Sequence, residues 1–214
     1  MPDRHLLSAD AQQLISAIAA LGQKTGAAIL SFYGQPERYH IQQKSNHTPL
    51  TAADLAAHDL LVRELPRIIN LPCLSEESDA AVHHNPPDDY WLIDPIDGTR
   101  EFIENTGQFC IAIARIRQGR PTLGFIYAPV SGDYWYALHG QGAYQTDARG
   151  NTRRLQCRAA ATPPTIITAR PALGKRMQAY LSDNFGDYRH ICRGSALKFC
   201  AIAEGDADLY PKLA

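Results

Sequence analysis

The residues best suited to chemistry in this sequence are two aspartates, Asp94 and Asp97, which follow a short apolar run. The run is aromatic and β-branched, so it predicts a buried strand that stops at Pro95, where the chain must turn. Gly98 lets a backbone approach a bulky group, and Thr99 adds a hydroxyl. Two carboxylates at this spacing suit Mg²⁺, which prefers oxygen ligands and keeps positions for water and phosphate. The alternative is a turn in which an aspartate caps the next segment, and the string alone leaves both readings open.

Three further carboxylates precede this string. Residues 71–77 predict a strand that ends in Glu76 and Glu77, and neighbouring strand residues point to opposite faces, so only one of them can face a site. Asp54 stands three residues after Thr51 at the start of a predicted helix, which is the layout of a capping box. The other interpretation of Asp54 is that it faces the metal site as a base or as an orienting group.

A third candidate feature lies near the end of the chain. Gly194 and Ser195 lead into a predicted helix over residues 195–204, and the free N–H groups at a helix start can hold an anion. Lys198 is one turn further along on the same face. These residues therefore predict a second place where an anionic group binds.

The remaining pattern predicts an α+β protein with two regions. Strands separated by Gly-rich turns between residues 109 and 144 predict an antiparallel meander, and alternating strand and helix after residue 164 predict an α/β region. Predicted helices are 8–32, 51–67, 173–181 and 195–204, and predicted strands are 39–41, 71–77, 90–93, 109–115, 122–128, 133–138, 142–144, 165–168, 190–192 and 207–210. We place the boundary near residue 160, so that residues 1–160 form an N-terminal metal-binding α+β region and residues 161–214 form a C-terminal α/β region.

Two other polar features have simpler explanations than a site. The arginine-rich stretch 148–158 predicts a solvated edge hairpin rather than an anion site, and the adjacent His83 and His84 predict exposed loop residues rather than metal ligands.

Composition limits the classes of function. The net charge of −1 over 214 residues gives no general field that attracts nucleic acid or an anionic membrane. The five cysteines form no Cys-x-x-Cys pair and predict buried, reduced thiols rather than disulfides or zinc. The first residues do not resemble a secretory signal, and no apolar run reaches membrane-spanning length. We therefore expect a cytoplasmic protein, with peripheral association at the cytoplasmic side of an inner membrane as a second option.

Together, these segments resemble a known family. Residues 72–77 (PCLSEE) and 91–99 (WLIDPIDGT), after residues 48–54 (TPLTAAD), are similar to the signature segments of the inositol monophosphatase-type phosphatases, which are Mg²⁺-dependent and Li⁺-sensitive. Residues 194–200 (GSALKFC) and 208–211 (DLYP) resemble the bacterial 3′(2′),5′-bisphosphate nucleotidases of sulfate assimilation. The similarity covers the chain from about residue 44 to its end. It implies a layered α/β/α/β/α sugar-phosphatase-like fold.

The resemblance also implies roles for individual residues. Glu76, Asp94 and the carbonyl of Ile96 would hold one Mg²⁺, and Asp94 with Asp97 would hold a second, out of two or three ions in all, with Li⁺ as an inhibitor. The implied catalytic residues are Asp54, Thr99 and Glu76, with Asp54 pairing with the Thr99 hydroxyl to take a proton from the attacking water. The implied substrate-binding residues are Glu76, Ile96, Asp97, Gly98, Thr99, Ser195 and Lys198.

The implied function is hydrolysis of the 3′-phosphate of adenosine 3′,5′-bisphosphate, giving AMP and phosphate, with 3′-phosphoadenosine 5′-phosphosulfate as a further substrate. Two alternatives stay open: a relative that acts on inositol phosphates, and a catalytically silent protein that binds a phosphorylated ligand. The expected partner is a small phosphorylated nucleotide and not a nucleic acid, and the oligomeric state is left open.

One expectation concerns the end of the chain. The family pattern continues beyond Tyr210 and Pro211 into a Trp-Asp segment whose aspartate completes the second metal site, whereas the sequence ends at Ala214. We therefore expect the last helix and strand of that fold to be missing from this chain and its activity to be reduced.

Overall fold

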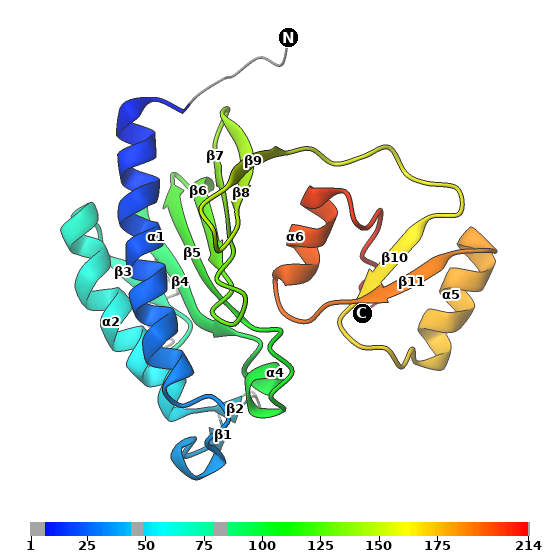
Figure 1. The fold of residues 1–214 in the computed structure, drawn as a ribbon, viewed down its shortest axis with the longest axis horizontal. Coiled ribbons are helices and arrows are strands. Elements are labelled where there is room, and N and C mark those ends of the chain that lie inside the picture. Colours follow the sequence, from blue (N-terminus) through cyan, green and yellow to red (C-terminus); the bar gives the residue numbers. More distant parts are fainter. Residues whose placement is uncertain (1–6, 44–48, 79–84, 214) are drawn as a thin grey trace.

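The structure, a computed structural model, describes residues 7–43, 49–78 and 85–213. A large sheet with helices on both faces is followed by a small sheet with its own helix (Figure 1). In chain order the elements are α1 (Ala9–Leu30), the 3₁₀ helix η1 (Pro36–Arg38), β1 (Gln42–Gln43), β2 (Pro49–Leu50), α2 (Ala52–Ile68), β3 (Cys73–Ser75), β4 (Asp89–Asp97), α4 (Thr99–Ile103), β5 (Cys110–Arg117), β6 (Arg120–Tyr127), β7 (Tyr134–Leu138), β8 (Gly142–Thr146), β9 (Thr152–Leu155), β10 (Thr165–Thr168), α5 (Lys175–Phe185), β11 (Arg189–Cys192) and α6 (Leu197–Glu204).

The large sheet has seven strands in the order β3-β4-β5-β6-β7-β8-β9. Strands β3 and β4 are parallel, and all later neighbours pair antiparallel. The meander predicted between residues 109 and 144 is confirmed. It continues into β9, whose first three residues are exposed, so the arginine-rich stretch does form part of an edge hairpin.

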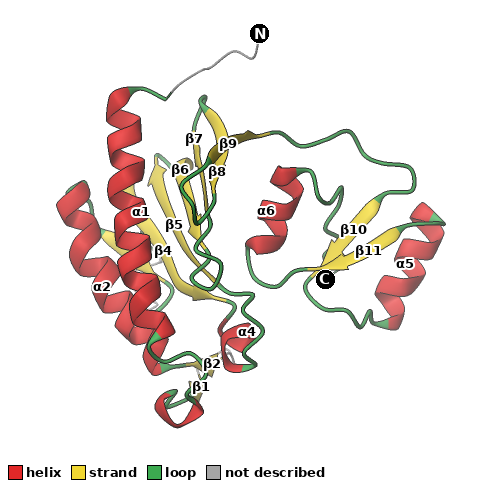
Figure 2. Ribbon diagram, in the orientation of Figure 1, coloured by secondary structure: helices red, strands yellow, loops and turns green. Residues whose placement is uncertain are grey.

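Helices α1 and α2 cover one face of this sheet (Figure 2). Their apolar stripes, with Ile15 and Ile18 on α1 and Leu61 on α2, form one buried cluster with Trp91 and Phe125 of the sheet. Ser8 caps α1, and its side chain accepts the Ala11 N–H. Full burial of a large apolar side chain contributes about 1.5–3 kcal/mol, so this cluster holds β4 firmly in the sheet.

The C-terminal part adds the second layer. Strands β10 and β11 pair in parallel, and α6 lies between this small sheet and the large one (Figure 1). Leu197 and Cys200 of α6 are buried against Cys110, Trp135 and Leu155 on the sheet face opposite α1 and α2. The predicted α+β class is confirmed, because a mixed sheet combines with helices on its faces.

The strand predicted to stop at Pro95 is longer than expected. Strand β4 continues through Pro95 to Asp97, and its pairing with β5 shifts register between Asp94 and Asp97. Proline is tolerated at such a bulge because a residue there makes no regular ladder hydrogen bond. The prediction that the strand ends at Pro95 was therefore wrong. A bulge within β4 takes the place of the predicted turn between Asp94 and Asp97.

Three other predicted strands differ. The strand over 71–77 ends at Ser75, where the Ser78 N–H closes a turn on the Ser75 carbonyl at 2.9 Å. Residues 207–210 form only a single bridge, between Ile166 and Leu209. The strand predicted for 39–41 is wrong, since the chain forms η1 beforehand and pairs only at β1. Pro36 favours that helical turn because its φ is already helical.

All five cysteines are free; Cys110 and Cys200 are buried, Cys73 and Cys192 are half-buried, and Cys157 is exposed. The prediction that the thiols are reduced is confirmed, but the prediction that they are buried holds fully only for Cys110 and Cys200.

None of the helices that the structure describes is long and apolar enough to span a membrane. His83 and His84 lie outside the described residues. The division near residue 160 stays a prediction; it falls in the connection between β9 and β10.

Candidate metal and phosphate site

Three of the carboxylates singled out in the sequence, those of Glu76, Asp94 and Asp97, lie around one pocket at the end of β4. The pocket has a volume of about 300 Å³, and four carboxylates line it, from Glu76, Asp94, Asp97 and Glu101. Ile96 lines it as well. The bulge in β4 explains this arrangement, because a bulge re-aims the side chains around it. The structure thus brings together all four residues predicted to bind metal.

Gly98 and Thr99 line the same pocket at the start of α4. Gly98 has φ +99°, a left-handed conformation that favours glycine. A Cβ there would stand 3.0 Å from the Cβ of Ser195 and 3.2 Å from the carbonyl oxygen of Gln108. Glycine is therefore required, because three segments of the chain approach one another at this point.

Asp54 is wholly buried and has two kinds of partner. Its Oδ2 accepts hydrogen bonds from the Thr51 N–H, at 2.8 Å, and from the Thr51 hydroxyl, which confirms the predicted capping box. Its Oδ1 accepts a hydrogen bond from the Thr99 hydroxyl at 3.3 Å. The two interpretations of Asp54 are therefore compatible, since one carboxylate completes the capping box of α2 and accepts from Thr99, which lines the pocket.

Asp97 lies among charges of both signs. Burial raises the pKa of Asp97, and the negative charges of Glu76 and Glu101 raise this pKa further. The Ala196 N–H, which donates a hydrogen bond to Asp97 Oδ2, and the charge of Lys198 lower it. A cation in the pocket would relieve the repulsion among these carboxylates.

The donor set of the pocket fits Mg²⁺. Carboxylates with a backbone carbonyl are hard oxygen donors, which suit Mg²⁺ and argue against zinc. In the parts of the chain that the structure describes, no three acidic, histidine or cysteine side chains already stand at the spacing of a complete metal site. Asp97 in particular is held by the Ala196 N–H. The residues fit in chemistry and in location, and their role as ligands stays a prediction.

Glu76 and Glu77 are distinguished by the pocket and not by strand alternation. Both follow the end of β3 at Ser75, so the alternation expected within a strand does not apply to them. The Glu76 N–H donates to the Ile93 carbonyl at 2.9 Å, whereas the Glu77 N–H points to the Ser75 hydroxyl at 3.4 Å. Of these two residues, Glu76 lines the pocket. The choice of Glu76 stays a prediction, now supported by location.

The segment before α6 differs from its prediction. Ser195 has φ +51° and stands outside the helix, which begins after Ala196. The Gly194 N–H donates to the Gln108 side chain at 2.6 Å, and the Ala196 N–H donates to Asp97. These N–H groups already have partners within the protein, so the predicted anion site at a free helix start is wrong in that form. The segment instead orients Asp97.

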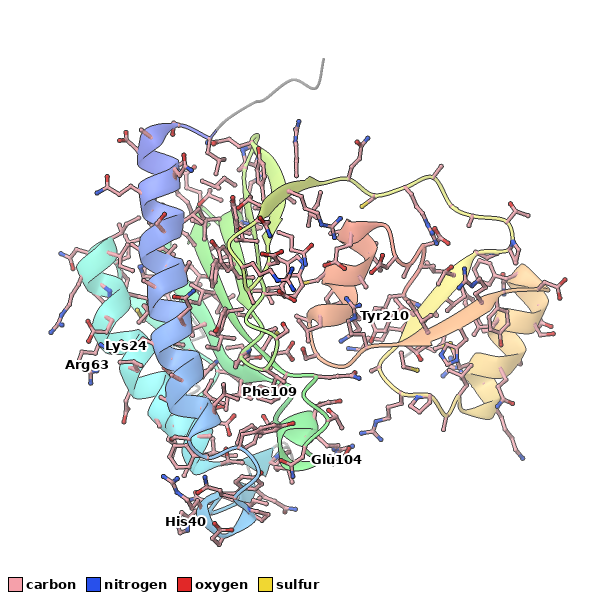
Figure 3. The ribbon with its side chains drawn as sticks, viewed as in Figure 1. Lys24, His40, Arg63, Glu104, Phe109 and Tyr210 are labelled. Atoms are coloured by element: carbon pink, nitrogen blue, oxygen red, sulfur yellow. The ribbon has the colours of Figure 1, made fainter. Side chains whose placement is uncertain are left out.

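Lys198 stands beside the pocket without lining it. Its ammonium donates to the Ser195 carbonyl and lies 5.1 Å from the ring centre of Phe199 and 5.2 Å from that of Tyr210, which is labelled in Figure 3. Among the residues described, neither Ser195 nor Lys198 belongs to the pocket lining. Their contact with a nucleotide stays a prediction.

Three residues near the site were not among the candidates taken from the sequence. Gln108 holds Gly194, as described above. The Sγ of Cys110 lies 3.3 Å from the Ser195 hydroxyl, and burial raises the pKa of this thiol well above its usual range, so it stays protonated. Arg170 lines the carboxylate pocket from the loop after β10. Its position after a strand of a parallel pair was the available clue, because ligands gather at the carboxyl ends of such strands.

A larger groove of about 640 Å³ adjoins the carboxylate pocket. Glu76 and Asp94 line both, and the rest of the larger groove is apolar, with Phe125 and Ile126 on the sheet and Phe199 on α6. Charged groups able to act on a phosphate ester are therefore found at the end that the two cavities share.

Comparison with known proteins agrees with this site. The model of the inositol monophosphatase family matches residues 10–214. The 3′(2′),5′-bisphosphate nucleotidase CysQ of Salmonella typhimurium is 36% identical over 201 residues, which cover 93% of this chain and 80% of that protein. CysQ of Escherichia coli K12 is 35% identical over 208 residues, with the same shares of the two chains.

A solved structure gives the same result for the fold. CysQ from Bacteroides thetaiotaomicron, described as a bacterial member of the inositol monophosphatase family, superposes with a TM-score of 0.77 and 32% identity, covering 95% of this chain and 80% of that one. The chain belongs to the inositol monophosphatase family.

Proposed function

We propose that this protein is a 3′(2′),5′-bisphosphate nucleotidase that removes the 3′-phosphate of adenosine 3′,5′-bisphosphate to give AMP and phosphate. The observation that carries the proposal is the carboxylate pocket in which the Thr99 hydroxyl bonds to the buried Asp54. The choice of substrate rests on the CysQ proteins of about 35% identity, which are named 3′(2′),5′-bisphosphate nucleotidases. We propose 3′-phosphoadenosine 5′-phosphosulfate as a further substrate.

In this proposal two or three Mg²⁺ ions would be held by Glu76, Asp94, Asp97 and the carbonyl of Ile96. Li⁺ would inhibit the hydrolysis. Bound Mg²⁺ would supply charge neutralisation at the phosphate and would lower the pKa of a water molecule. No nitrogen or sulfur ligand is needed for this chemistry.

The chain's own residues have distinct tasks at the scissile phosphate. The Thr99 hydroxyl donates to Asp54, so the lone pairs of the Thr99 oxygen can face the attacking water. Thr99 then takes up a proton from that water as its own proton passes to Asp54. Gly98, without a side chain, lets the phosphate approach the start of α4. Ser195 and Lys198 lie beside the nucleotide. The chain divides near residue 160 into the region that carries the carboxylates and the region that supplies these two residues.

The proposed setting is the cytoplasm, with peripheral association at the inner membrane as the second option. A small phosphorylated nucleotide is the partner. The same pocket would also serve an inositol phosphate, so the substrate must be decided by assay.

The test is phosphate release by the 214-residue chain in Mg²⁺ from adenosine 3′,5′-bisphosphate and from an inositol monophosphate. We expect kcat/KM on the bisphosphate to exceed that on the inositol phosphate. A preference for the inositol phosphate would replace the proposed substrate, and binding of both without phosphate release would identify a silent relative.

A further inference from the structure

We propose that Arg170 binds the second phosphate of the substrate, the one that is not removed, and so selects nucleotide bisphosphates over simple monophosphates. This inference rests on the proposed function and concerns the same pocket. Adenosine 3′,5′-bisphosphate carries a 5′-phosphate that takes no part in hydrolysis. Such a dianion needs a cation of its own, and guanidinium offers two parallel N–H donors for it.

The topology places Arg170 at the correct edge of the small sheet. Strands β10 and β11 are parallel, so their carboxyl ends point the same way. The continuation of β11 reaches the carboxylate pocket, because the Ala196 N–H donates to Asp97. The continuation of β10 leads to Arg170, which lines the same pocket. Ligands of parallel sheets bind at this edge.

The backbone at Arg170 is held in place. The Thr168 hydroxyl, on a residue only 6% exposed, donates to the Arg170 carbonyl at 2.7 Å. The Arg193 N–H donates to the Thr168 carbonyl at 3.0 Å, which ties the ends of β10 and β11 together. The exposed side chain of Arg170 therefore starts from a fixed point beside the pocket.

Two other cations near the site already have partners. Arg193 pairs with Glu204 at 3.4 Å, and the Lys198 ammonium donates to the Ser195 carbonyl and lies over two aromatic rings. In the described parts of the chain, no carboxylate pairs with the Arg170 guanidinium. Arg100 also lines the pocket, from α4 in the same segment as Thr99. Arg170 approaches from the other region of the chain.

The experiment compares two substrates that differ only in the second phosphate, adenosine 3′,5′-bisphosphate and adenosine 3′-monophosphate. For Arg170→Gln we expect kcat/KM on the bisphosphate to fall about tenfold or more, the scale of a lost charge-assisted hydrogen bond, and kcat/KM on the monophosphate to change less than about twofold. Arg149→Gln, which removes an exposed arginine between β8 and β9, should change neither value.

A binding measurement separates this inference from the proposed function. AMP keeps the 5′-phosphate and lacks the scissile one, so Arg170→Gln should weaken AMP binding by calorimetry about tenfold, whether or not the chain turns over the bisphosphate. An equal loss on both substrates, unchanged AMP binding, or a selective loss in Lys198→Met with none in Arg170→Gln would overturn the inference. That last result would assign the second phosphate to Lys198, as the sequence first suggested.

Discussion

Glu76→Gln should weaken Mg²⁺ binding and lower kcat/KM for phosphate release by more than about a hundredfold, whereas Glu77→Gln should change both only slightly. Partners that merely orient a metal ligand contribute about 10–100-fold, so a direct ligand contributes more. Glu76 lines the carboxylate pocket at the point where it meets the apolar groove. Glu77 carries the same charge one residue further on, outside that lining.

The pair is a matched control, because each change removes one negative charge from the same turn. Mg²⁺ affinity is measured by calorimetry on each variant, so the result does not depend on turnover alone. Glu76 is exposed, and exposed substitutions usually change stability by about 0.5 kcal/mol or less, so thermal melting should be nearly unchanged. Equal losses of Mg²⁺ affinity in both variants would show that Glu76 is not the ligand.

Asp54→Asn should lower kcat by about 10²–10⁴, the usual range for a general base, while the protein stays folded. The amide keeps the shape of the side chain and can still accept a hydrogen bond. It is too weak a base, however, to take up a proton from the Thr99 hydroxyl. Weakening of the capping box, in which Asp54 Oδ2 accepts from the Thr51 N–H and hydroxyl, should cost about 0.5–2 kcal/mol of stability as well. Denaturant unfolding and steady-state kinetics on the same preparation measure the two effects.

The control for the structural effect is Ser8→Ala. Ser8 caps α1, and its hydroxyl accepts the Ala11 N–H at 3.2 Å, far along the chain from the pocket residues. This variant should lose a similar amount of stability and keep its kcat. If Asp54→Asn also kept its kcat, the Asp54 carboxylate would be part of the capping box of α2 and nothing more.

Several features could be read from the sequence because local interactions decide them. The capping box of Thr51 and Asp54 depends on residues three apart, and it formed as predicted. The meander from residue 109 to 144 followed from short predicted strands with turn residues between them. The grouping of Asp94 and Asp97 at the end of one strand was likewise visible, since both belong to one short segment.

Other features depend on contacts between distant segments, and there local patterns failed. Pro95 predicted a strand end because proline has no N–H donor. Strand β4 nevertheless continues to Asp97, because it pairs with β5 on both sides of a bulge. The helix start at Ser195 was displaced because the Ala196 N–H bonds to Asp97, almost a hundred residues earlier. A backbone donor that has such a partner is not available to a ligand.

By itself, the sequence determined which residues are candidates for the chemistry, because acidic side chains, a hydroxyl and glycine at fixed spacing suit a metal-assisted attack on phosphate. Only the tertiary structure decided their arrangement. It places Glu76 rather than Glu77 at the pocket, brings Asp54 to Thr99, and adds Arg170 from the small sheet. The physical reason is that pocket lining and burial are properties of chain segments brought together by packing, which residue spacing along one segment does not encode.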